Sequence, residues 1–177
     1  MILMQNEIKI KIEKFSKEDF SRLISWINCE EILVQFAGPI FSFPLTDDQL
    51  EAYLTDRKRS AFKVINANDN TVIGHAEIYL MKDNVAKLCR VLIGENKNRG
   101  KGIGQKIVSE LLKFSFIKLG VYCAELNVYD WNISAIKCYE KMGFSINKGV
   151  FNTVIVNGNE WVSLNMTTNK SVWNNLV

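Results

Sequence analysis

Residues 94–104 read Gly94-Glu95-Asn96-Lys97-Asn98-Arg99-Gly100-Lys101-Gly102-Ile103-Gly104, a glycine-rich run between two segments of regular character. Residues 85–93 before it are mostly apolar, as in a buried strand. After it, apolar residues recur at helical spacing as far as Leu119, and Gly120 marks the end of the helix. A glycine-rich turn at a helix N-terminus presents unpaired backbone N–H groups, and the helix dipole favours an anion there. The run predicts a phosphate-binding turn, with a plain turn without a ligand as the alternative.

The spacing of these glycines disfavours two common nucleotide-binding motifs. In the mononucleotide loop G-x-x-x-x-G-K-[ST] the glycines are five residues apart, whereas Gly94 and Gly100 are further apart, and Gly102 replaces the magnesium-binding hydroxyl. In the dinucleotide fingerprint G-x-G-x-x-G the last glycine is replaced by Gln105 when the motif starts at Gly100. ATP, GTP and NAD are therefore disfavoured as ligands of this turn.

Two segments carry a resemblance to a known family. Residues 99–104, RGKGIG, resemble the pyrophosphate-binding signature of the GNAT superfamily, which is Gln or Arg, two residues, Gly, one residue, then Gly or Ala. Residues 132–144 resemble the family's N-x-x-A-x-x-x-Y-x-K-x-G-F segment and match it at every fixed position. Asn132 and Tyr139 are nearly two helical turns apart, so both lie on one face of the predicted helix. Residues 26–54 are loosely similar to the branch that includes ribosomal-protein Nα-acetyltransferases.

The resemblance implies that the chain binds acetyl-CoA and identifies the residues that would hold it. Main chain near Leu92 and Ile93 would pair with acetyl-pantetheine, and a backbone N–H there would polarise the thioester carbonyl. Tyr139 would be the general acid that protonates the CoA thiolate. The alternatives are an aromatic residue at the core edge for Tyr139 and a plain helix cap for Asn132. The implied cofactor-binding residues are Leu92, Ile93, Arg99, Gly100, Lys101, Gly102, Ile103, Gly104, Asn132 and Tyr139.

The base that takes the proton of the attacking amine is less well defined by the sequence. Where some family members place a glutamate, this chain has Asn127. Glu77 and His75 share one face of a predicted strand, and Glu125 shares a face with Asn127. Glu77 is the first candidate for a catalytic base. The alternative for Glu77 is an ordinary ion pair with Arg90.

The order of predicted elements is typical of an α/β (α+β) domain. The resemblance implies the GNAT fold, a central, mixed, mostly antiparallel twisted sheet of about seven strands with about four helices on its two faces. We expect helices from residue 17 to about 28 and from 47 to about 59, and an aromatic-rich loop at 36–44. The predicted core covers about residues 7–167, and residues 168–177 are expected to form a weakly ordered tail that Trp173 could tether. The predicted strands are 7–15, 61–65, 72–80, 85–93, 122–128, 150–156 and 160–166.

Composition indicates one domain spanning residues 1–177. A chain of 177 residues with 47% hydrophobic content can build a substantial core, and its net charge of +3 does not indicate a nucleic-acid partner. The apolar N-terminus lacks the basic flank of a signal peptide, and no segment approaches the roughly 20 apolar residues of a membrane span. We expect a cytoplasmic protein without a membrane partner. A metal site is not expected, because the cysteines are scattered and His75 is the single histidine.

These observations together predict an acetyl-CoA-dependent N-acetyltransferase in which a primary amine attacks directly within a ternary complex. No Cys–His or Ser–His arrangement in the sequence supports a covalent intermediate. The acceptor is expected to be a small-molecule amine or a protein amine such as an N-terminus, and the protein a monomer or homodimer. The alternative is a non-catalytic CoA-binding or protein-interaction module on the same fold, against which Tyr139 argues.

Overall fold

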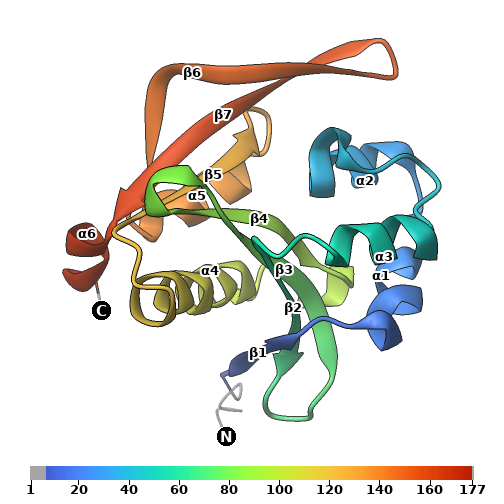
Figure 1. The fold of residues 1–177 in the computed structure, drawn as a ribbon, viewed down its shortest axis with the longest axis horizontal. Helices are drawn as coiled ribbons and strands as arrows, with labels where there is room; N and C mark the ends of the chain where they lie inside the picture. Colours follow the sequence, from blue (N-terminus) through green and yellow to red (C-terminus); the bar gives the residue numbers. More distant parts are fainter. Residues whose placement is uncertain (1–6, 177) are drawn as a thin grey trace, which may run out of the picture.

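A computed structural model describes residues 7–176, which fold around a seven-stranded sheet of order β1-β2-β3-β4-β5-β7-β6 (Figure 1). Neighbouring strands pair antiparallel except β4 and β5, which are parallel. The predicted mixed, mostly antiparallel sheet is therefore confirmed. The strands are β1 (Ile10–Lys14), β2 (Arg59–Asn66), β3 (Val72–Leu80), β4 (Val85–Ile93), β5 (Cys123–Tyr129), β6 (Ser145–Val156) and β7 (Asn159–Asn169).

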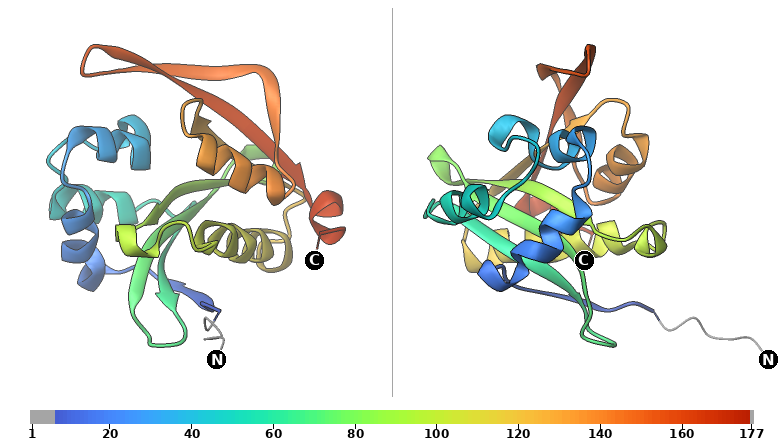
Figure 2. Two further views of the ribbon diagram at one scale, coloured as in Figure 1. Left: turned by 180° about the vertical axis from the view of Figure 1, so that it is seen from behind. Right: turned by 90° about the vertical axis from the view of Figure 1, so that its right-hand side faces the viewer.

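Helices cover both faces of the sheet, as expected. On the α4/α5 face, alternate apolar residues of the central strands pack against the amphipathic α4 and α5. On the other, the α1–α3 face, a second cluster includes Phe20 and Leu23 of α1, Leu33 of α2 and Leu50 of α3. In Figure 2, α3 and α4 lie on opposite sides of the sheet. The helices are α1 (Phe20–Trp26), α2 (Glu30–Ala37), α3 (Asp47–Leu54), α4 (Ile103–Lys113), α5 (Ile133–Lys141) and α6 (Lys170–Asn174).

Two expectations for the N-terminal part are wrong in detail. The loop predicted at 36–44 begins only after Ala37, because the acidic first turn of α2 starts a helix that Gly38 ends with a φ of 59°. The helix expected to reach about residue 59 ends at Leu54. Asp56 then forms a turn by accepting the Lys58 N–H at 3.0 Å, and Arg59 already belongs to β2. Helical propensity does not reveal that Arg59 pairs with Tyr79 in the sheet.

The expectation of a weakly ordered C-terminal tail is also wrong for residues 168–176. Strand β7 continues to Asn169, which lies opposite Cys123 of β5. The Asn169 side chain then caps α6 by accepting the Val172 N–H at 3.0 Å. Trp173 is buried against Phe116, with ring centroids 5.5 Å apart. The end of the chain therefore closes one side of the core.

The parallel strands β4 and β5 separate part-way along their length. They pair from Val85 opposite Cys123 to Leu88 opposite Leu126, and within the described chain no pairing between them continues beyond this point. A bulge bends β4 here, since its register with β3 shifts between His75 and Glu77 and Arg90 adopts a left-handed φ of 49°. The facing edges of β4 beyond Leu88 and of β5 beyond Leu126 are thus left open.

Candidate active site

The glycine-rich turn forms an open cradle at the N-terminus of α4. Gly100 and Gly102 have φ values of 74° and 72°, a left-handed conformation that strains other residues. A Cβ atom on either glycine would meet no atom within 4 Å. The empty space above the main chain, together with the unpaired N–H groups at the start of α4, fits a phosphate group.

The side chains around this cradle fall into two groups. Arg99 and Lys101 are exposed and can add positive charge to it. Ile103 is buried in the core, so only its backbone can contribute to the cradle. Gly104 lies where α4 meets α5, and a Cβ atom there would be 3.5 Å from the Cys138 sulfur. The side chains of Arg99 and Lys101, but only the backbone of Ile103, are therefore accessible at the cradle.

Tyr139 of α5 packs against the core of the α4/α5 face, and Cys89 of β4 is among the groups that affect its electrostatics. Burial raises the pKa of its hydroxyl well above the ordinary value, and the Cys138 and Cys89 thiols raise it further. Cys89 follows Leu88, the last residue of β4 that pairs with β5. The phenol therefore keeps its proton at neutral pH and can act as a donor. Asn132 caps α5 by accepting the Ala135 N–H at 3.3 Å, which leaves its amide nitrogen for other contacts.

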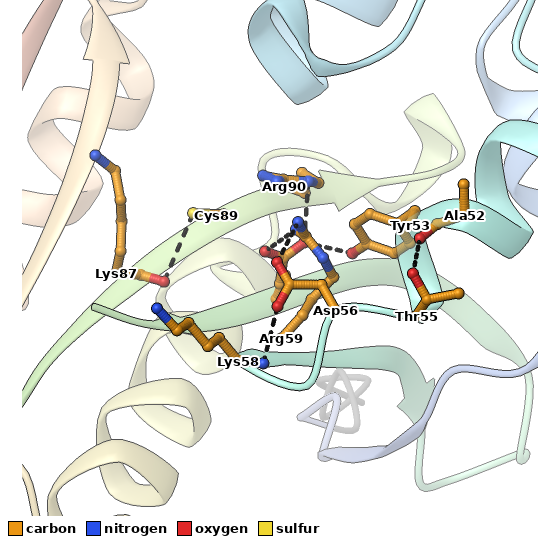
Figure 3. A network of polar contacts seen from close by, with 10 residues as sticks. Ala52, Tyr53, Thr55, Asp56, Lys58, Arg59, Lys87, Cys89 and Arg90 are labelled. Atoms are coloured by element: carbon orange, nitrogen blue, oxygen red, sulfur yellow. Dashed lines mark hydrogen bonds and ion pairs between the residues drawn. The ribbon is translucent and has the colours of Figure 1, made fainter. Parts of the chain in front are cut away.

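Glu77 lies at the centre of a buried ionic cluster on the α1–α3 face. Its carboxylate is fully buried and pairs with Arg59 Nη1 at 2.5 Å and with Arg90 Nε at 2.9 Å. The Tyr53 hydroxyl donates a hydrogen bond to the same carboxylate. Figure 3 shows Arg59 from β2, Arg90 from β4 and Tyr53 from α3 converging on this point. Both oxygens of Glu77 are thus engaged.

This arrangement favours the ion-pair alternative for Glu77 over a role as catalytic base. A general base must reach the proton that it removes, and Glu77 has no exposed surface. The Arg90 guanidinium lies 5.5 Å from the centre of the Tyr53 ring, which closes the cluster further. Burial, and secondarily the Glu77 charge, raise the pKa of Tyr53 well above its ordinary value. The cluster links α3 to three strands at the β4 bulge.

Comparison with known proteins assigns the chain to a family. Residues 25–144 match the model of the acetyltransferase (GNAT) family, a span of more than half the chain. The chain belongs to the GNAT acetyltransferase family. It is therefore an acetyl-CoA-dependent N-acetyltransferase.

Individual relatives of this acetyltransferase are distant. An aminoglycoside N(6')-acetyltransferase type 1 of Klebsiella pneumoniae is 25% identical over 156 residues, covering 81% of this chain and 77% of the relative. A spermidine N-acetyltransferase of Vibrio cholerae, solved with CoA and spermine, has a TM-score of 0.79 at 20% identity over 93% of this chain and 98% of its own. An aminoglycoside acetyltransferase solved with coenzyme A has a TM-score of 0.72 at 20% identity, covering 94% and 98% of the two chains. These structures show that the fold is shared. The similarity of residues 26–54 to the ribosomal-protein branch stays a prediction.

The sequence alone did not reveal two groups of residues on the α1–α3 face of this acetyltransferase. One is a row of amides in which Asn165 of β7 contacts Asn127 of β5 at 3.1 Å. The other is an aromatic cluster of Tyr129, Trp131 and Trp161. Both require β7 to lie between β5 and β6, a strand order that the chain order does not reveal. In the part of the chain that the structure describes, no helix is long and apolar enough to cross a membrane.

His75 of this acetyltransferase is buried beside the ionic cluster and is not placed to act as a base. It is 1% exposed, its Nε2 lies 3.4 Å from the Tyr53 hydroxyl, and its Nδ1 has no partner among the described residues. Burial, and secondarily the Arg90 charge, lower the pKa of His75 to about 3, against an opposing effect of Asp19. The ring is therefore neutral at the pH of most assays.

The buried His75 predicts a loss of stability in mild acid. Between pH 6.5 and pH 3 the unfolded chain binds a proton that the folded histidine does not, so stability falls as the pH is lowered. From pH 7 to pH 5 we expect a loss of about 2 kcal/mol in the free energy of unfolding from this group. Urea titrations of wild type and His75→Gln at both pH values measure it. Equal pH dependence in the two proteins would contradict a neutral buried His75.

Proposed function

We propose that this enzyme transfers the acetyl group of acetyl-CoA to the primary amine of a small molecule by direct attack within a ternary complex. The observation that carries the proposal is the separation of β4 and β5 beyond Leu88 and Leu126. Open strand edges can pair with the amides of an extended pantetheine arm. The cradle at the start of α4 would then hold the pyrophosphate of the same molecule.

The proposed cofactor-binding residues contribute backbone groups or positive charge. The turn contributes backbone N–H groups, with Arg99 and Lys101 adding charge. Leu92 and Ile93 lie on β4 beyond the last residue paired with β5, where their main chain can face the thioester. An N–H donor there would stabilise the charge that develops on the carbonyl oxygen.

The reaction needs no covalent enzyme intermediate. The amine nitrogen attacks the thioester carbon, a C–N bond forms, and the C–S bond breaks. The departing thiolate takes a proton from Tyr139, which regains one from solvent. Because Glu77 is engaged with two arginines, we propose that a water molecule accepts the proton that the attacking amine loses.

Coverage of the α1–α3 face supports a compact acceptor rather than an extended peptide. The Tyr129 hydroxyl donates to the Val34 carbonyl at 3.4 Å, which ties β5 to α2. Asn157, in the turn between β6 and β7, donates to Glu31 of α2. α2 therefore links β5 to the β6–β7 turn on this face. The aminoglycoside and spermidine acetyltransferases among the similar proteins are named for small amines as well.

A bulky side chain in the cradle should abolish most acetyl-CoA binding. Gly102→Trp fills the open space above the turn and blocks at least two charge-assisted hydrogen bonds, so we expect roughly 100-fold weaker binding by calorimetry. Gly120→Trp is the matched control, because Gly120 has a φ of 69° and an equally open Cβ position far along the chain. Equal affinity in Gly102→Trp and wild type would refute the cradle.

A further inference from the structure

A hydrogen-bonded row of polar side chains begins at the opening between β4 and β5. Asn127 is the first residue of β5 beyond Leu126, and its side chain is exposed. Asn165 Nδ2 lies 3.1 Å from Asn127 Oδ1 and 3.4 Å from the Leu126 carbonyl. Asn147 Nδ2 donates to Asn165 Oδ1 at 2.5 Å, and the Thr167 hydroxyl donates to Asn147 Oδ1 at 3.2 Å.

The Leu126 carbonyl sets the direction of every amide in this row. A carbonyl oxygen can only accept, so the NH₂ group of Asn165 must face it, and the Asn165 oxygen must face Asn147. The same NH₂ group faces the oxygen of Asn127. The oxygen of Asn127 therefore faces β7, and its own NH₂ group is left without a partner among the described residues. That group is a donor, which recognises an oxygen atom and cannot take a proton from an amine.

The aromatic cluster of Tyr129, Trp131 and Trp161 continues the same face. The Tyr129 and Trp131 rings are parallel within 2°, with centroids 5.7 Å apart, and Trp161 packs nearly perpendicular to both. Trp131 keeps 45% of its surface exposed. Tyr129 is two residues from Asn127, roughly 6.6 Å along the strand, about the width of one sugar ring. The negative face of such a ring attracts the weakly positive C–H groups of a saturated ring.

Carboxylates on this part of the face are already neutralised. Strands β3 to β7 carry three acidic residues, Glu77, Glu125 and Glu160. Glu77 pairs with two arginines, and Glu125 pairs with Lys87 at 3.0 Å. Glu160 adjoins Trp161 in the strand, so its side chain points to the opposite face. On the face that carries Asn127, a linear polycation would therefore find no uncompensated carboxylate among the residues of these strands.

We infer that the acceptor is an amine carried on a hydroxylated ring, an amino sugar, with its ring against the aromatic cluster and an oxygen on Asn127. This inference rests on the proposed acetyl transfer and narrows its acceptor. Amide donors beside an exposed tryptophan match the alternating oxygen atoms and C–H faces of a sugar. Asn165 is a positioning residue, since it holds the direction of Asn127 without facing the opening.

Steady-state kinetics with glucosamine, a singly charged amino sugar, and with spermidine, at saturating acetyl-CoA, test the inference. We expect kcat/KM for an amino sugar to exceed that for spermidine at least tenfold. Trp131→Ala and Asn127→Ala should each raise the KM for the amino sugar roughly tenfold, with acetyl-CoA affinity unchanged by calorimetry. Phe151→Ala is the matched control, because Phe151 is 58% exposed but lies opposite Leu164, on the other face of the β6–β7 pair.

Asn127→Asp provides a second test, in which kcat/KM should change in opposite directions for the two substrates. It replaces the donor with a free carboxylate, so kcat/KM should fall for the amino sugar and rise for spermidine. Preference of the wild type for spermidine, or unchanged KM in both alanine variants, would overturn the inference while leaving acetyl transfer itself intact. A wild type that does not bind acetyl-CoA would overturn both the inference and the proposed function.

Discussion

Glu77→Gln will lower the free energy of unfolding by about 3–5 kcal/mol, because it leaves the Arg90 guanidinium without its counter-charge and Arg59 with only Asp56, at 3.6 Å. The side chains of Arg59 and Arg90 are only 11% and 9% exposed, so water cannot replace the lost carboxylate. The loss is a large share of the 5–15 kcal/mol that stabilises a typical domain. Urea unfolding followed by circular dichroism measures it.

Glu125→Gln is the matched control for this prediction. Its partner Lys87 is 25% exposed and Glu125 itself 21%, so the pair is partly solvated. Removing it should cost less than about 1 kcal/mol. A Glu77→Gln protein of wild-type stability that loses the acidic limb of its pH–rate profile would instead identify Glu77 as the base. The two measurements thus separate the two roles left open for this residue.

Local patterns were sufficient to predict the central part of the fold. Strands β3 and β4 begin and end where the sequence predicts, since turn formers interrupt the apolar residues on each side. The glycine-rich turn was predictable because the spacing of its glycines is itself the geometric requirement. The left-handed conformations of Gly100 and Gly102 are what that spacing needs.

Features that depend on the pairing of distant strands could not be predicted. The sequence places Glu77 on the correct strand, but its contact with Arg59 depends on the β2–β3 register and its contact with Arg90 on the bulge in β4. The contact of Asn127 with Asn165 depends on the insertion of β7 between β5 and β6. Helix α2 was missed because it is short and followed closely by Pro39.

Tyr139→Phe should lower kcat by roughly 10²–10⁴-fold, the usual contribution of a positioned general acid. The substitution removes one hydroxyl and keeps the ring, which packs against Phe144 at a centroid distance of 6.1 Å. Acetyl-CoA affinity and stability should therefore change little. The effect belongs to the step in which the C–S bond breaks and the sulfur acquires negative charge.

The pKa of Tyr139 allows a discriminating version of this experiment. Because burial raises that pKa, the phenol stays protonated across the assay range, and its own ionisation should not produce an alkaline limb below pH 10. In acetyl-CoA analogues with a more acidic thiol, the thiolate leaves without help from a proton. Tyr139→Phe and wild type should therefore turn these analogues over at similar rates. An equal defect with natural and activated thioesters would mean that Tyr139 positions the thioester instead of protonating the sulfur. Unchanged kcat with acetyl-CoA would exclude Tyr139 as the general acid.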